Sequence, residues 1–121
     1  MTSASSMTSE QVVARFVEIS VQQDDAVLAN EVSRFNRLYA EKVVLVEELK
    51  SRTDDQRRLL LGLYQHPNPQ VRLNAANATL ALVPAAARAV LEELRKNKLY
   101  SQALDAGMDI KALDQGIYKP T

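Results

Sequence analysis

Cysteine is missing from this 121-residue chain, and the chain has few glycines, prolines and histidines: three, four and one, respectively. Without cysteine there can be no disulfide framework, thiolate metal site or cysteine nucleophile. The single histidine, His66, lacks a second imidazole or a thiolate with which to hold a transition metal. We therefore interpret His66 as a turn residue and expect no metal site.

Long apolar runs and phosphate-binding loops are missing as well. No apolar run approaches the roughly 18 residues that span a bilayer, and the start of the chain lacks a basic segment followed by an apolar one. We therefore expect a cytoplasmic protein without membrane contact. The three glycines stand apart, and no serine or lysine has an activating base at a recognisable spacing. We expect no enzymatic activity and no cofactor.

Neither sign of charge dominates, because 15 basic side chains balance 15 acidic ones. The charges are unevenly placed, since residues 1–50 hold eight acids and five bases whereas residues 51–98 hold four acids and eight bases. Surface variation accounts for this asymmetry, and a basic face for nucleic acid over residues 51–98 is the alternative. Because the region falls short of the strongly basic surface that nucleic acids usually require, we favour a protein partner.

Apolar side chains at helical spacing are abundant, and no segment alternates like a strand, which predicts an all-α fold. Thr8 with Gln11, and Thr53 with Gln56, have the spacing of a capping box at a helix start. We expect residues 1–7 to be disordered and residues 8–121 to form a single domain. The predicted helices cover residues 8–22, 24–50, 53–66, 69–83 and 84–97, followed by two short pieces ending at Gly107 and Gly116.

The second predicted helix has an apolar stripe whose members recur every three or four residues. These are Leu28, Val32, Phe35, Tyr39, Val43, Val46 and Leu49. The unbroken spacing predicts one helix with this stripe toward the core, although a kink near residues 39–42 is an alternative. The same stripe could serve a homodimer.

The segment from His66 to Ala76 resembles the inter-helix turn and second helix of a HEAT repeat. It combines a proline-rich turn with Val71, Arg72 and then small residues. The resemblance implies helix pairs that stack on one another, as a right-handed superhelix or a compact bundle of about six helices. In HEAT repeats the arginine at the position of Arg72 commonly links neighbouring helix pairs by hydrogen bonds, and a partner contact is the alternative.

The chain as a whole resembles a family of small bacterial proteins catalogued only as a domain of unknown function. Residues 35–38, 47–50, 66–76, 105–108, 112–114 and 117–120 carry this resemblance. It implies a HEAT-like helical fold in a bacterial cytoplasm and no assigned activity. Small helical proteins of this kind include immunity partners of secreted toxins, so by analogy we expect a non-catalytic module that binds a toxin or inhibits an enzyme.

Polar or amphipathic side chains that the pattern places on the outside are the candidate contacts with a partner. They are Asn36, Arg37, Arg57, Arg58, Tyr64, Gln70, Asn74 and Asn77. Arg57 and Arg58 stand in the most basic stretch, for which a solvated face is the alternative. We expect Tyr39 in the core and Tyr64 exposed beside the turn, because aromatic residues with a polar tip are frequent interface anchors.

Overall fold

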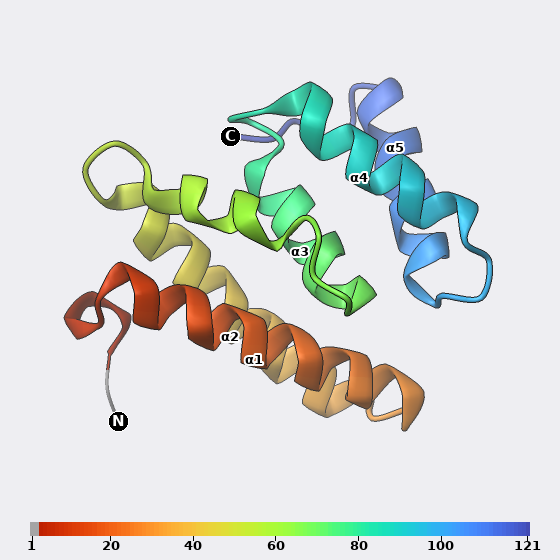
Figure 1. Cartoon of the computed structure of the whole chain (residues 1–121). Helices are drawn as coiled ribbons and strands as arrows, with labels where there is room; N and C mark the ends of the chain where they lie inside the picture. The colour runs from red at the N-terminus through yellow and green to blue at the C-terminus, as the bar shows by residue number, and fades with distance from the viewer. Residues whose placement is uncertain (1–2) are drawn as a thin grey trace. The chain divides into compact units, whose positions relative to one another are not determined.

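The computed structural model describes residues 3–121, and every regular element in that range is a helix (Figure 1). The prediction of an all-α fold is confirmed. The chain divides into two compact units, residues 1–59 and 60–121. That residues 8–121 form a single domain stays a prediction. The elements are η1 (Ala4–Ser6), α1 (Ser9–Leu28), α2 (Val32–Ser51), η2 (Gln56–Leu63), α3 (Pro69–Thr79), α4 (Pro84–Lys96) and α5 (Gln102–Asp114).

Helix α1 begins at the predicted capping box. The hydroxyl of Thr8 accepts from the backbone N–H of Gln11 at 3.1 Å, and the side-chain oxygen of Gln11 accepts from the N–H of Thr8 at 2.8 Å. The predicted break at residues 22–25 is wrong, because α1 continues to Leu28. Gln23 and Ala26 are buried, so the packed side of the helix runs on through the polar stretch. The chain turns instead at Asn30, whose φ of 56° is a left-handed conformation that asparagine tolerates.

Helices α1 and α2 lie side by side as two long helices of the first unit (Figure 1). The prediction of one helix over residues 24–50 is wrong at its start, because the turn after Leu28 separates α1 from α2. Its end near residue 50 is confirmed, since α2 continues without a break to Ser51. Its buried side chains are Leu38, Leu45 and Leu49, whereas Tyr39 is exposed. The predicted direction of its apolar stripe is therefore wrong for Val32, Tyr39 and Val43, which are exposed, whereas Leu49 of the same stripe is buried as expected.

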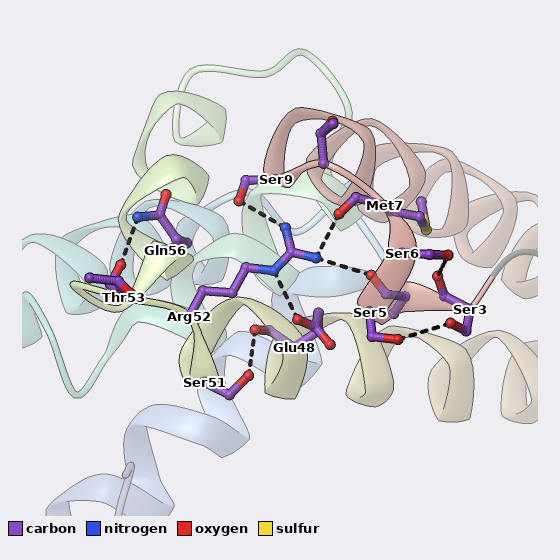
Figure 2. Close-up of polar contacts among 12 residues, drawn as sticks. Ser3, Ser5, Ser6, Met7, Ser9, Glu48, Ser51, Arg52, Thr53 and Gln56 are labelled. Atoms are coloured by element: carbon purple, nitrogen blue, oxygen red, sulfur yellow. Dashed lines mark hydrogen bonds and ion pairs between the residues drawn. The ribbon is translucent and has the colours of Figure 1, made fainter.

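Arg52 joins residues 4–9 to the end of α2 by hydrogen bonds (Figure 2). Its guanidinium group donates to Glu48 at 2.8 Å, to the hydroxyl of Ser9 at 3.0 Å, and to the backbone oxygens of Ala4 and Met7 at 3.1 and 2.7 Å. Residues 4–6 form the short helix η1. The prediction of disorder over residues 1–7 thus differs from the structure over residues 3–7, and residues 1–2 lie outside the described residues.

The segment after α2 does not form the α-helix predicted from Thr53. The side-chain amide of Gln56 donates to the backbone oxygen of Thr53 at 2.8 Å instead of closing a capping box. Asp54 and Asp55 have φ values of 64° and 52°, which are incompatible with the first turn of an α-helix. Residues 56–63 then form the 3₁₀ helix η2.

Three helices, α3, α4 and α5, build the second unit. Asn68 caps α3 and Pro69 is its first residue, as predicted, but α3 ends at Thr79 rather than Val83. Helix α5 runs unbroken through Gly107, so the prediction of two short pieces there is wrong, whereas Gly116 has the expected left-handed φ of 72°. The core of this unit consists of Leu73, Ala76, Leu80, Ala87, Leu91, Leu94, Ala106 and Ile110.

Candidate functional site

The exposed side of α2 holds two of the predicted contact residues, Asn36 and Arg37. Asn36 lies in a stripe with Val32, Tyr39 and Val43, whose spacing of four, three and four residues places all four on one side of the helix. The exposed fractions of the three apolar members are 66%, 51% and 41%. We call Val32, Asn36, Tyr39 and Val43 the α2 stripe. A largely apolar side with one amide is typical of a surface that another protein covers.

The ammonium group of Lys42 lies over the ring of Tyr39, with its nitrogen 4.4 Å from the ring centre. A cation in this position is attracted by the negative face of the ring, and at an exposed site the contact contributes about 0.5–1 kcal/mol. The contact favours one orientation of the tyrosine ring. A restrained aromatic side chain loses less conformational entropy when a partner packs against it.

Two hollows flank α2 within the first unit. An apolar hollow of about 210 Å³ adjoins the turn between α1 and α2, and its lining includes Val27, Phe35 and Val32 from the α2 stripe. A polar hollow of about 260 Å³ is lined by Gln22, Arg34, Arg37, Leu38 and Glu41. Arg37 thus lies at a concave surface, as a contact residue would, and Val32 joins the apolar hollow to the stripe.

Arg57 is buried, which contradicts its prediction as a surface contact. Its guanidinium nitrogens lie 2.8 and 2.6 Å from the two carboxylate oxygens of Asp55. This pairing lowers the pKa of Asp55 and raises that of Arg57, because each charge stabilises the other. The neighbouring Arg58 is exposed and stays a candidate contact.

Tyr64 is half-buried rather than exposed, so its predicted role as an interface anchor is not supported. Its hydroxyl shares a short hydrogen bond with the hydroxyl of Thr79, and its ring packs against the core of the second unit. Burial raises the pKa of the phenol. The tyrosine that is exposed is Tyr39, so the two predictions were the wrong way round.

Gln70 and Asn74 were predicted to face solvent, and both are buried, with exposed fractions of 3% and 4%. The side-chain amide of Gln70 donates to the oxygen of Asn74 at 3.0 Å, and the amide of Gln102 on α5 donates to the oxygen of Gln70 at 2.9 Å. The polar stripe of α3 therefore joins two helices. Buried amides are stable when they pair with one another.

Asn77 continues the same stripe and is half-buried. Its amide nitrogen donates to Asp109 at 3.0 Å and to the backbone oxygen of Leu73 at 3.2 Å, while its oxygen accepts from the hydroxyl of Tyr118 at 3.1 Å. These contacts tie α3 to α5 and to the C-terminal tail. Asn77 is thus a structural residue rather than a free contact.

The arginines of the basic stretch are largely engaged with carboxylates. Arg88 contacts Asp114 at 2.8 Å, and Arg95 contacts Glu92. With Arg52 and Arg57 this makes four of the eight bases in residues 51–98 partners in ion pairs. Over residues 3–121 no three acidic or histidine side chains gather where a metal ion could be held.

Arg72 does not make the hydrogen bonds that the HEAT resemblance implied. The buried N–H at Nε has no acceptor, and the guanidinium group lies over the ring of Tyr100. Sequence reasoning also missed Gln102 and Tyr118 as partners of the polar stripe. Amides on one predicted helix could have been matched with polar residues on another, but spacing within one helix does not show which helix lies opposite.

None of the helices in the part of the chain that the structure describes is long and apolar enough to cross a membrane. No protein with a curated description matches the chain. A solved crystal structure, of protein RPA1889 from Rhodopseudomonas palustris CGA009, is 46% identical over 100% of both chains, with a TM-score of 0.94. A family model described as a domain of unknown function, DUF2019, matches residues 10–114. The chain therefore belongs to the DUF2019 family.

Proposed function

We propose that this protein is a non-catalytic module that binds another protein through the α2 stripe. The observation that carries the proposal is the exposure of Val32, Tyr39 and Val43 on one side of a long helix whose buried side is formed by other residues. Exposed apolar surface of this kind is costly in water, and covering it with a partner recovers that free energy. Asn36 supplies a hydrogen-bonding group within the same stripe.

The surroundings of the stripe support this use. The apolar hollow at its Val32 end could receive one side chain of a partner, since about 210 Å³ exceeds the size of a leucine side chain. Arg37 at the polar hollow supplies a charge that would orient the encounter. The resemblance of residues 66–76 to a HEAT repeat also favours binding, because proteins built from such helix pairs commonly present extended surfaces to partners.

A retention experiment with paired variants tests the proposal. The full chain, a Tyr39→Ala variant and a Leu104→Ala control would be immobilised and exposed to a lysate of the source organism. Leu104 is another exposed large side chain, located on α5 in the second unit. A specific partner should be retained by the wild type and by the control, and truncation of Tyr39 should weaken its binding by about 1 kcal/mol or more, roughly fivefold. Equal retention by all three proteins would refute binding through the stripe.

A second copy of the chain is one candidate partner. Measuring the mass of the protein in solution distinguishes this case from binding to a different protein. If the stripe joins two copies, light scattering should give a dimer for the wild type and a monomer for Tyr39→Asp. If the wild type is a monomer, the stripe faces a different protein. The result decides whether the stripe binds a second copy of the chain or a different protein.

The narrower form of the proposal is that the partner is a bacterial toxin or an enzyme to be inhibited. It rests on the analogy with small helical immunity proteins. A toxin encoded beside this gene would supply the test, because coexpression with the wild type should restore growth and coexpression with Tyr39→Asp should not. Growth arrest in both cases would count against the toxin as the partner.

A further inference from the structure

Arg72 differs from the other arginines that are shielded from solvent. Among residues 3–121, every other arginine that is buried or half-buried forms an ion pair with a carboxylate. These are Arg15, Arg34, Arg52, Arg57 and Arg88. Arg72 is half-buried, and no carboxylate of the described residues lies within ion-pair distance of it. A cation withdrawn from water without a counter-ion costs free energy, so its position calls for an explanation.

The geometry of this side chain is asymmetric. The inner nitrogen, Nε, is sealed from solvent and has no hydrogen-bond acceptor, whereas the two terminal nitrogens are not among the sealed nitrogens that lack a partner. The central carbon Cζ lies 5.6 Å from the centre of the Tyr100 ring. Tyr100 is itself partly buried against the core of the second unit. The guanidinium group thus lies over an aromatic ring in a side chain that is only half-buried.

We propose that the outer edge of Arg72 is a binding site for an oxyanion, a carboxylate or a phosphate group. Both groups present two oxygens that match the fork of a guanidinium group. The ring of Tyr100 fixes the side chain before the ligand arrives, which lowers the entropy lost on binding. The sealed Nε shows that water is excluded from one side of the charge, and exclusion of water strengthens its attraction for an anion.

This site lies in the second unit and goes beyond the α2 stripe, which belongs to the first. A carboxylate on a peptide would contact Arg72 through its two oxygens. Inorganic phosphate would use the charge alone.

Nuclear magnetic resonance of the arginine side chains tests the site in the full chain. The Nε–H signal of Arg72 is assigned by its loss in Arg72→Lys. Sodium acetate and sodium phosphate are then added separately, with sodium chloride replaced so that ionic strength stays constant. We expect a saturable shift of this signal with a dissociation constant on the order of 10 mM, the range of a single charge-assisted contact. The signals of Arg88 and Arg95 should not saturate, because their guanidinium groups already contact carboxylates.

The two anions distinguish the sources of the ligand. Saturation with acetate but not phosphate supports a carboxylate, and the reverse supports phosphate. A shift that is the same in chloride, or that Arg88 shows equally, reflects ionic screening and overturns the site. Tyr100→Phe keeps an aromatic face and should retain binding, whereas Tyr100→Ala should weaken it severalfold.

Thermal unfolding gives a second measure of anion binding when the Nε–H resonance of Arg72 is too broad to follow. At 100 mM anion the midpoint should rise for the wild type and for Tyr100→Phe but not for Arg72→Lys, since a ligand that binds the folded state stabilises it. An equal rise for Arg72→Lys would show that the anion acts elsewhere. Circular dichroism of each variant at low temperature confirms that it is folded before this comparison is made.

Discussion

Helix α2 of the first unit and helix α3 of the second use their faces in opposite ways. Along α2, the apolar stripe of Val32, Tyr39 and Val43 is exposed, and the core is built by a different line of leucines. Along α3, the polar stripe that includes Gln70 and Asn74 is buried between helices. The comparison teaches that the spacing of a stripe identifies one side of a helix, while the neighbouring helices decide which side is covered.

The largest expected difference in the free energy of unfolding is between a substitution in the core of the second unit and a substitution in the α2 stripe. Leu91 is fully buried in that core, so Leu91→Ala should lower the free energy of unfolding by about 2–5 kcal/mol through lost burial and the cavity left behind. Tyr39→Ala removes an exposed ring and should change it by less than about 1 kcal/mol. Urea unfolding followed by circular dichroism measures both.

A large loss for Tyr39→Ala would contradict this comparison, because it would mean that the ring contributes to the core. Leu49→Ala is the matched control within α2, since Leu49 is fully buried. It should behave like Leu91→Ala. If all three variants differ little from the wild type, the leucine lines do not form the cores described above.

The next largest difference in stability is expected between substitutions of two amide side chains, one in each unit. Gln70→Ala removes the hydrogen bonds that join Gln70 to the buried amides of Asn74 and Gln102, and loss of hydrogen bonds between buried polar groups costs about 1–3 kcal/mol. Asn36→Ala on the exposed stripe should cost no more than about 0.5 kcal/mol. The same urea experiment, with the two variants measured side by side, checks the pair. Equal losses would show that burial does not separate the two amides.

Local chemistry in the sequence was enough to predict much of the fold. Thr8 with Gln11 determined the start of α1, while Asn68 and Pro69 determined that of α3, because capping involves residues close together in the chain. The failure at Asp54 and Asp55 has a physical reason. Their carboxylates suit a helix start, but the structure gives both residues left-handed backbones and pairs Asp55 with Arg57.

The candidate site was less predictable, because exposure depends on packing between helices. Asn36, Arg37 and Arg58 are exposed as predicted, whereas Gln70 and Asn74 are buried. Gln70 reaches Gln102, which stands 32 positions further along the chain. No spacing rule within α3 could reveal that partner. The resemblance to a HEAT repeat implied hydrogen bonds from Arg72 to a neighbouring helix pair, but the lack of an acceptor for its Nε is visible only in three dimensions.

The ion pair of Asp55 predicts a smaller, pH-dependent effect in the first unit. Arg57 lowers the pKa of Asp55 below its ordinary value of 3.8, so the pair stabilises the fold above that value and the contribution is lost as the pH falls toward the folded-state pKa. Asp55→Asn should therefore lower stability at pH 7 by less than about 1 kcal/mol and should matter progressively less as the pH falls below 3.8. Asparagine tolerates the left-handed backbone at this position, so the substitution tests charge rather than strain.

Substitution of Asp105 in the second unit should have the smallest effect on the free energy of unfolding, and this effect should have the opposite sign. Partial withdrawal of its carboxyl group from water raises its pKa above 3.8, because burial disfavours the charged form. The folded state then holds its proton more tightly than the unfolded state, and stability falls as the pH rises through the folded-state pKa. Asp105→Asn should raise the free energy of unfolding at pH 7 by no more than about 0.5 kcal/mol, since the residue is largely exposed. Urea unfolding at pH 7 and pH 3 beside Asp55→Asn measures both signs, and a loss of stability at pH 7 for Asp105→Asn would show that its charge is compensated by a neighbour.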